Sequence, residues 1–385
     1  MPPANLLDAL VLGHTDRREE ERILALLREV AASELDTLVR EVDAAALFRS
    51  LDDHLIGPAN RAALRDLLIG RLGDLGPLAR ANLAYGLQAG RTDAGDERAL
   101  ATLFLAHTGA ELTAFKNLVN MRTDAHDLEG LVFNDIDDAG VRDEILAHIA
   151  AEAAGVAQGE AKILSDIDDT VVCALHDRRY PKGTLYPGVL ALYDALDRGP
   201  EDRPSSLGDL TFVTARPGDA LGLIENHTRA SLRRAGIATH SVLTGGLISL
   251  VTHDAMAARK VANIRHYHAL FPEYRMVFVG DSGQGDIAVG RALLGEFAQV
   301  VDVVLIHDVV DTPADGRAAL AAEGINVFDT YIGAARIAER KGLISEAGLA
   351  RVVDESFAAL AGIAWSSAAQ QAAVRALMER DAAAS

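Results

Sequence analysis

The amino-acid sequence predicts an α/β domain with a parallel sheet, preceded by an all-helical N-terminal segment. Short apolar runs begin near residue 161 and alternate with stretches of helical periodicity. Strands separated by helices indicate βαβ units, which build parallel sheets. The runs expected to form strands are Ile163-Leu164, Leu210 to Val213, Met276 to Val279, Val300 to Ile306 and Ile325 to Phe328.

The segment before the first strand has the pattern of amphipathic helices. Apolar residues recur at i, i+3, i+4 and i+7, as in Ile23, Leu26, Leu27 and Val30. We interpret this segment as a helical bundle with a scaffolding or docking role, for which the sequence names no protein partner. An alanine- and glycine-rich stretch, 148–160, marks its end. We expect a helical domain over 1–155, the α/β domain over 156–345 and a C-terminal helical extension over 346–385.

Composition and charge limit the possible partners and location of the protein. The 385 residues carry a formal net charge of −19, which repels long nucleic acids and requires local positive charge to attract a phosphorylated substrate. The single cysteine, Cys173, cannot form an internal disulfide, and we interpret it as an apolar filler. The N-terminus lacks the basic region of a signal peptide, and no apolar run approaches the roughly 20 residues that span a bilayer. These features predict a soluble, cytoplasmic protein.

Polar motifs follow the predicted strands at their carboxyl ends, where open parallel sheets bind ligands. The first strand is followed by Asp-Ile-Asp-Asp-Thr at 166–170, and the second by Thr-Ala-Arg-Pro at 214–217. Lys260 stands at the start of a predicted helix before the third strand. That strand is followed by Gly-Asp-Ser-Gly-Gln-Gly-Asp at 280–286.

This ordered set closely resembles the haloacid dehalogenase (HAD) superfamily over about Ala161 to Ile344. The resemblance implies a HAD-like Rossmannoid sheet and phosphoryl transfer through an aspartyl-phosphate. Dehalogenases of this superfamily lack the second aspartate, which is present here as Asp168, and its transport ATPases carry a lysine where this chain has Ile167. A phosphatase is favoured over a phosphotransferase, because water is the default acceptor.

The chemistry of phosphoryl transfer supports specific roles for the motif residues. A carboxylate can attack phosphorus and divide one difficult step into two, which makes Asp166 the expected nucleophile. Asp168 would protonate the leaving oxygen and then deprotonate the attacking water. Thr214 and backbone N–H groups would hold phosphoryl oxygens, and Lys260 would supply fixed positive charge.

A magnesium ion is the expected cofactor, since Mg²⁺ prefers hard oxygen ligands. Asp281, Asp166 and the backbone carbonyl of Asp168 are the expected ligands, with Asp286 as a further ligand or as support behind them. The remaining candidates for substrate binding are Thr170, Ala215, Arg216, Arg178 and Arg179.

The segment between the first motif and the next helix, 171–186, is too short for a large cap over the site. We therefore expect an open site that suits a bulky substrate, unless the N-terminal helical domain covers it. Basic residues in this flap form either a lip that recruits phosphate or ordinary solvated loop charges, and the sequence leaves both interpretations open. They are Arg178, Arg179 and Lys182.

A second copy of the tetrapeptide serves as a control for the motif. Asp135-Ile136-Asp137-Asp138 repeats the residues of 166–169, but Ala139 and Gly140 follow it and a helical stretch comes next. Aspartates are common in turns and at the start of helices. We expect this copy to be a helix cap or loop, with no catalytic role.

The closer resemblance is to the catalytic domain of the actin-patch-associated phosphatidate phosphatases and their bacterial relatives. It is carried by the segments 165–170, 280–284, 304–309 and 334–344. It implies Mg²⁺-dependent removal of phosphate from phosphatidate and related lipid phosphates, with peripheral membrane contact. His307 stands where the resemblance leads us to expect an arginine, and it either contacts substrate or is a hydrogen-bonded histidine at a strand end.

Two other functions are kept beside the lipid phosphatase. One is a phosphatase of soluble phosphates or nucleic-acid ends, although the net charge argues against long nucleic acid. The other is an adaptor, in which the helical N-terminal segment binds a partner and the phosphatase domain is secondary. The intact set of motifs argues against loss of catalysis.

Overall fold

The computed structural model describes residues 15–51, 60–90, 92–121, 127–156, 161–204, 209–217, 241–245 and 253–384. The chain divides into two compact units. Unit 1 consists of Met1–Val156 with Ala269–Glu273, and unit 2 of Ala157–His268 with Tyr274–Ser385. The three-part division expected from the sequence remains a prediction. No helix within the described ranges is both long and apolar enough to span a bilayer.

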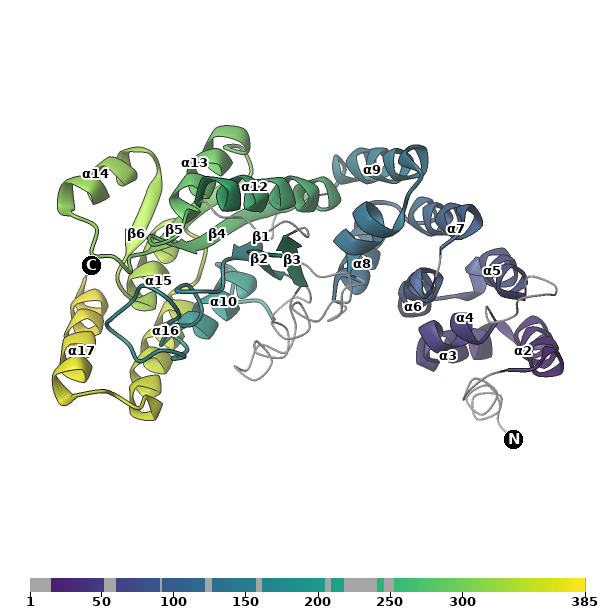
Figure 1. Cartoon of the computed structure of the whole chain (residues 1–385), viewed down its shortest axis with the longest axis horizontal. Coiled ribbons are helices and arrows are strands. Elements are labelled where there is room, and N and C mark those ends of the chain that lie inside the picture. The colour runs from purple at the N-terminus through teal and green to yellow at the C-terminus, as the bar shows by residue number, and fades with distance from the viewer. Residues whose placement is uncertain are drawn as a thin grey trace. The chain divides into compact units, whose positions relative to one another are not determined.

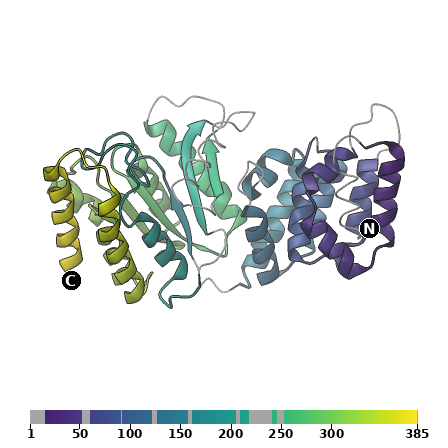
Figure 2. The same cartoon turned by 90° about the horizontal axis from the view of Figure 1, so that it is seen from below.

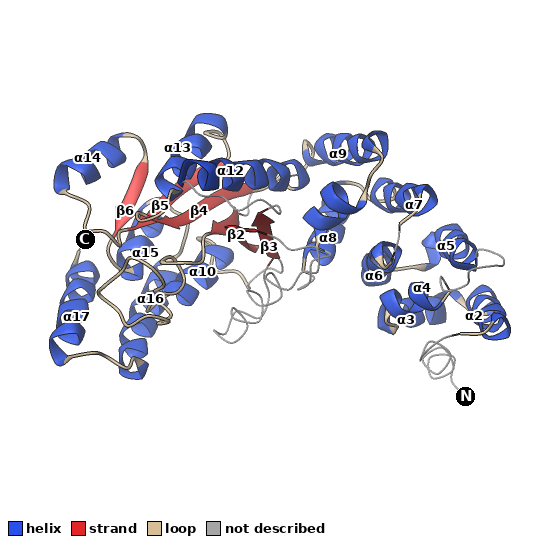
Figure 3. Cartoon of the chain, in the orientation of Figure 1, coloured by secondary structure: helices blue, strands red, loops and turns tan. Residues whose placement is uncertain are grey.

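The regular elements described in unit 1 are helices (Figure 3). In α2, Ile23 and Leu27 are fully buried, as their spacing predicts, and Asp16 forms a capping box with Glu19 at its start. The elements are α2 (Arg17–Glu29), α3 (Ala32–Glu41), α4 (Ala44–Ser50), α5 (Asn60–Gly70), η1 (Leu72–Asp74), α6 (Pro77–Gln88), α7 (Ala94–Leu105), α8 (Gly109–Asn120), η2 (Gly130–Asp135) and α9 (Ala139–Ala153).

The second copy of the aspartate tetrapeptide starts a helix, as predicted. Asp138 is the N-cap of α9, and its carboxylate accepts hydrogen bonds from the backbone N–H groups of Gly140 at 2.7 Å and Val141 at 3.2 Å. These bonds satisfy N–H groups that have no partner inside the helix.

Unit 2 is built on a six-stranded parallel sheet in the order β3-β2-β1-β4-β5-β6 (Figures 1 and 2). The strands are β1 (Ala161–Ser165), β2 (Leu210–Pro217), β3 (Ser241–Gly245), β4 (Arg275–Asp281), β5 (Val301–His307) and β6 (Ile325–Phe328). The predicted fold class is confirmed. The five predicted runs form strands, and β3 is a sixth strand that the sequence reasoning missed.

Helices cover both faces of this sheet, with α12 and α13 on one side and α10, α15 and α16 on the other (Figure 1). Strands buried on both faces have continuous apolar runs, as in β4, where Val277, Phe278 and Val279 are fully buried. The helices are α10 (Val189–Arg198), α12 (His253–Leu270), α13 (Asp286–Glu296), α14 (Ala314–Ala322), α15 (Tyr331–Arg340), α16 (Glu346–Ala359), η3 (Leu360–Gly362) and α17 (Ala368–Ala383).

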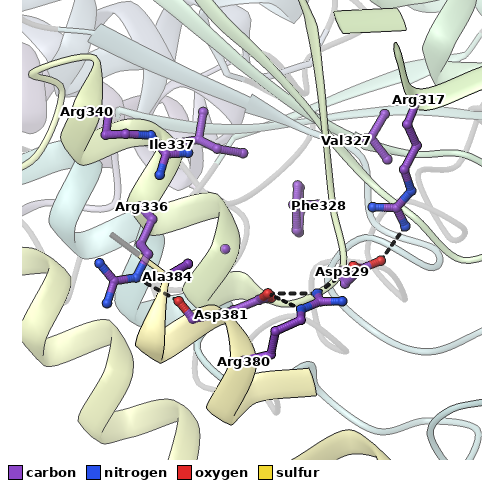
Figure 4. A pocket seen from close by; sticks show the side chains of 11 residues that line it. Arg317, Val327, Phe328, Asp329, Arg336, Ile337, Arg340, Arg380, Asp381 and Ala384 are labelled. Atoms are coloured by element: carbon purple, nitrogen blue, oxygen red, sulfur yellow. Dashed lines mark hydrogen bonds and ion pairs between the residues drawn. The ribbon is translucent and has the colours of Figure 1, made fainter. Parts of the chain in front are cut away.

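The C-terminal helices belong to the core of unit 2. Val352 of α16 and Met378 of α17 lie in the same apolar cluster as Ile163 of β1. Polar contacts also hold α17 around a cavity of about 240 Å³ (Figure 4). They include Arg336 Nε to Asp381 O at 2.7 Å, Arg380 to Asp329 at 2.6 Å, and Thr330 Oγ1 to Asp381 at 2.7 Å. The helix is therefore fixed by apolar packing and by ion pairs.

Substitutions at two glycines with similar φ angles can distinguish the cost of backbone strain from the cost of steric overlap. A Cβ on Gly188, at φ +85°, would lie 2.0 Å from Ser356 Oγ, whereas one on Gly183, at φ +81°, would meet no atom within 4 Å. We expect Gly188→Ala to lower the free energy of unfolding by about 2–4 kcal/mol and Gly183→Ala by about 1–2 kcal/mol. Urea denaturation of both variants would measure the difference, and equal losses would contradict this account of Gly188.

Candidate active site

The motif loops meet where the strand order reverses. β1 lies between β2 and β4, so the connections from β1 and from β4 lead to opposite sides, which is the point where open parallel sheets bind ligands in a crevice. Asp166 directly follows β1, and its backbone N–H donates to Val279 O of β4 at 2.9 Å. Asp281 is the last residue of β4. Parallel pairing of β1 with β4 therefore sets two distant motifs side by side.

Three buried carboxylates lie together at this point of the sheet. Asp166, Asp281 and Asp286 each offer an oxygen atom, and these atoms lie within 4.8 Å of one another. Asp286 is the first residue of α13, and its Oδ2 accepts the backbone N–H of Asp281 at 3.2 Å. A Cβ on Gly280 would lie 2.6 Å from the Asp286 side chain, so the approach requires glycine at this position.

Lys260, from α12, lies between two of the carboxylates. Its Nζ donates to Asp166 Oδ1 at 2.7 Å and to Asp286 Oδ1 at 2.5 Å, and the side chain is buried. Burial disfavours the charged ammonium, but the two carboxylates outweigh this effect, and the pKa of Lys260 lies above its usual value. The ammonium is therefore a fixed positive charge.

One ammonium does not neutralise three carboxylates. Burial, together with the nearby charge of Asp286, raises the pKa of Asp166 to about 7 and that of Asp281 to about 9. Buried oxygen donors at this spacing, which hold protons when no cation is bound, fit a hard divalent cation. The cluster contains three of the four predicted metal-ligating residues.

Asp168 lies next to this cluster but is not one of the three grouped carboxylates. It is half-buried, and its backbone carbonyl accepts a hydrogen bond from Gln284 Nε2 at 3.3 Å. The same Nε2 lies 3.5 Å from Asp281 Oδ2. Gln284 therefore joins the first motif loop to the loop after β4, a role that the sequence reasoning did not assign.

The structure describes the side chains of some predicted substrate-binding residues and not of others. Thr170 is fully buried, with Oγ1 3.5 Å from Asp166 Oδ2. Thr214, Ala215 and Arg216 form the carboxyl-terminal part of β2, the neighbour of β1, but their side chains lie outside the described residues. Their predicted roles remain predictions.

Asp169 organises the flap, 171–186, from a buried position at its base. Its carboxylate accepts backbone N–H bonds from Ala174 at 2.7 Å, Leu175 at 2.9 Å and His176 at 2.5 Å. Burial would raise the pKa of this carboxyl, but these hydrogen bonds outweigh burial and lower the pKa. Asp169 also adopts φ +59°, in the left-handed region that is uncommon for residues other than glycine.

The C-terminal segment of unit 2 contacts the outer part of the flap. Val172 pairs with Leu185 as an antiparallel bridge, so the two flap arms lie together. Gln370 Nε2, from α17, donates to Arg178 O at 3.3 Å, and the rings of Trp365 and Tyr180 lie 5.9 Å apart. The flap is therefore attached to the body of the unit at its base and on its outer side.

Arg179 is held by the protein itself. Its guanidinium donates to Asp177 at 2.9 Å, to Asp329 O at 3.0 Å and to His307 Nε2 at 2.9 Å. Tyr186 OH donates to the same Asp177 carboxylate at 3.1 Å. The structure thus places Arg179 in a fixed network, whereas the neighbouring Arg178 is exposed.

The same network fixes the protonation of His307. Because Arg179 can only donate, Nε2 must accept, so Nδ1 carries the proton and donates to Asp169 O at 2.9 Å. Burial and the charge of Arg179 lower the pKa of His307 to about 4. His307 is therefore a hydrogen-bonded histidine at the strand end, one of its two predicted roles.

Other buried groups near the nucleophile position were not recognised from the sequence. Tyr193 OH lies 2.6 Å from Ser165 Oγ, and Tyr331 OH donates to Thr170 O. Both tyrosines lie among the apolar residues of helices, so their pattern is that of core residues. Cys173 is buried, and burial raises the pKa of its thiol, which disfavours the nucleophilic thiolate.

The six-stranded sheet and its buried cluster of three carboxylates and one lysine define an α/β domain with a candidate cation site. Residues 161–308 match the family model described as phosphatidate phosphatase APP1, catalytic domain. This match confirms the resemblance to the phosphatidate phosphatase catalytic domain over the segment that contains Asp166, Lys260 and Asp286. No curated protein and no solved structure matches the chain.

The neutral, buried His307 makes a testable contribution to acid stability. Its pKa is lower in the folded state, about 4, than the ordinary 6.5, so this contribution is complete above pH 6.5 and is lost as the pH falls towards 4. We expect the wild type to lose about 2–3 kcal/mol more than His307→Gln between pH 7 and pH 4.5. Urea denaturation at both pH values would measure this, and equal losses would contradict the neutral assignment.

Proposed function

We propose that the protein is a Mg²⁺-dependent phosphomonoesterase of the HAD type, which removes phosphate from phosphatidate or related lipid phosphates through an aspartyl-phosphate. The observation that carries the proposal is the cluster of three buried carboxylates and one lysine at the crevice of the sheet. This cluster lies in the segment that matches the family described as a phosphatidate phosphatase catalytic domain.

Asp166 is the proposed nucleophile. Lys260 holds its Oδ1 at 2.7 Å, which fixes the carboxylate and leaves Oδ2, 3.5 Å from Thr170 Oγ1, to attack phosphorus. The attack forms a bond between Asp166 and the phosphoryl group and releases the alcohol of the lipid. Water then hydrolyses this intermediate and regenerates the carboxylate.

Asp168 is the proposed acid and base for these two steps. It follows the proposed nucleophile by two residues and is half-buried. In the first step it would donate a proton to the leaving oxygen, and in the second it would accept one from the attacking water. Thr214 and backbone N–H groups are proposed to bind phosphoryl oxygens.

Asp166, Asp281 and the backbone carbonyl of Asp168 would hold Mg²⁺, with Asp286 as a ligand or as support through water. The bound ion would neutralise charge on the phosphoryl oxygens and orient them for in-line attack. Lys260 adds a positive charge that does not depend on the ion, because two carboxylates keep it protonated.

A lipid substrate is proposed from the family match, and the form of the entrance supports it. Between β1 and α10 the chain is described without a gap, and it builds only the flap over the site. This segment therefore adds no separate cap domain, which suits a substrate whose phosphate reaches the carboxylates while its bulk stays outside. The protein would meet such a lipid at the membrane surface, and we propose that it works in the cytoplasm.

Replacement of the proposed nucleophile gives the first test. We expect Asp166→Asn to reduce phosphate release by at least about 1,000-fold, because the amide cannot attack phosphorus. The assay would use phosphatidate in detergent micelles and an aryl phosphate, each with and without Mg²⁺.

Asp354→Asn, an exposed aspartate on α16, is the matched control and should retain activity. Release that favours phosphatidate and needs Mg²⁺ would support the full proposal. Activity that persists in Asp166→Asn would contradict the nucleophile, and release from the aryl phosphate alone would remove the lipid from the proposal.

Binding of Mg²⁺ should compete with protons at the cluster. The raised pKa values, about 7 for Asp166 and about 9 for Asp281, mean that these groups must lose protons to bind the ion. We expect Mg²⁺ affinity to be roughly 10-fold or more weaker at pH 6 than at pH 8. Calorimetry in buffers of different ionisation enthalpy would measure proton release, and an affinity independent of pH would contradict the assignment.

A further inference from the structure

A second pocket lies between the flap and the loop that follows β5. Its volume is about 520 Å³. The flap contributes one wall and the loop the other. The lining residues are Leu175, His176, Asp177, Arg178, Arg179, Val309, Val310 and Asp311.

This pocket adjoins the carboxylate cluster. A Cβ on Gly283 would lie 2.7 Å from His176 Nδ1, on the pocket wall, and 3.1 Å from Asp281 Oδ1, in the cluster. The pocket wall and the carboxylate cluster therefore come close to each other beside Gly283. A molecule whose phosphate reaches the cluster would have the rest of its length close to the pocket rim.

Two large apolar side chains stand exposed on the rim. Leu175, on the flap, is 58% exposed, and Val310, on the opposite loop, is 48% exposed. Among the described residues, the other exposed large apolar side chains are Leu78 and Leu105, both in unit 1. Single exposed apolar residues are ordinary, but a pair on the two walls of one pocket beside the candidate active site indicates a contact surface.

Each rim residue is presented by a loop that a buried carboxylate holds in place. Asp169 binds the backbone N–H of Leu175 at 2.9 Å on the flap side. On the other side Asp308, 2% exposed, accepts the backbone N–H of Thr312 at 2.9 Å and the hydroxyl of Ser282 at 3.1 Å. Hydrogen bonds to Asp169 and Asp308 thus hold the two loops in place. Leu175 and Val310 are therefore exposed on ordered backbone.

One arginine on the rim can face the headgroups of a lipid surface. Arg178 is exposed, and its guanidinium makes no ion pair with any residue that the structure describes. The carboxylate of Asp177 is occupied by Arg179 and Tyr186, which leaves Asp311 as the opposing charge among the residues that line this pocket. An arginine beside two apolar side chains can remain at the level of the headgroups while its neighbours enter the acyl layer.

We propose that Leu175 and Val310 form an apolar rim that inserts into a lipid surface and contacts the acyl part of the substrate. The inference rests on the proposed function and extends it by naming the residues that distinguish a lipid from a soluble phosphate. With the rim inserted, a lipid phosphate could reach Asp166 without leaving the bilayer completely.

The test uses the full chain and vesicles of phosphatidylcholine with phosphatidate. We expect Leu175→Ser combined with Val310→Ser to weaken vesicle co-sedimentation by about 10-fold or more, because two apolar side chains lose their burial. The ratio of kcat/KM on vesicles to kcat/KM on an aryl phosphate should fall by a similar factor. The matched control, Leu78→Ser combined with Leu105→Ser, removes exposed apolar side chains from unit 1 and should change neither quantity.

A second set of variants measures insertion of the rim into the lipid directly, by tryptophan fluorescence. In a Trp365→Phe background, which removes the single native tryptophan, Val310→Trp should show a blue shift of emission when vesicles are added, whereas Leu78→Trp should not. Unchanged binding and ratio in the rim double variant, with no shift at 310, would overturn the rim even if the wild type hydrolyses phosphatidate. Vesicle binding that depends on the rim, in a wild type that releases no phosphate from phosphatidate, would support the rim and reject the proposed substrate.

Discussion

The ammonium of Lys260, held between Asp166 and Asp286, is the interaction on which the site depends. Isolated buried charges are costly, so three carboxylates can share one crevice only where a counter-charge is built in. A single lysine leaves the cluster short of positive charge, and the raised pKa values of Asp166 and Asp281 express that deficit. A divalent cation bound at this site would supply the missing positive charge. One balance of charge thus sets both how the buried carboxylates are stabilised and how they would bind a cation.

The arrangement of the motifs followed from the sequence because parallel strands all present their carboxyl ends at one edge. Once the apolar runs of β1 and β4 were recognised, the residues after them had to meet there. For Asp138 the sequence left a helix cap and a loop open, and the structure shows the helix cap. β3 was missed because Ser241–Gly245 is short and has only one adjacent pair of large apolar residues, Val242 and Leu243.

Local sequence patterns could not predict which residues from distant segments contact one another. The charge of Arg179 suggested a phosphate ligand, but its partners include Asp329 O and His307, which are far away in the chain. Asp169 was visible as a third carboxylate in the motif, yet its task of holding the flap depends on how the following seven residues turn back over it. Residue type predicts which groups can bind or react. Tertiary structure decides which of these groups are already bonded to other parts of the protein.

The family match ends at residue 308, one residue after β5, whereas the core of unit 2 does not end there. β6 completes the sheet, α15 to α17 complete the apolar cluster, and Gln370 and Trp365 touch the flap from this later part of the chain. The stretch by which the domain is recognised is therefore shorter than the stretch that folds with it. Two proteins with identical motif residues could still differ in how firmly their C-terminal segments hold the flap. They could therefore differ in the size of substrate that reaches the site.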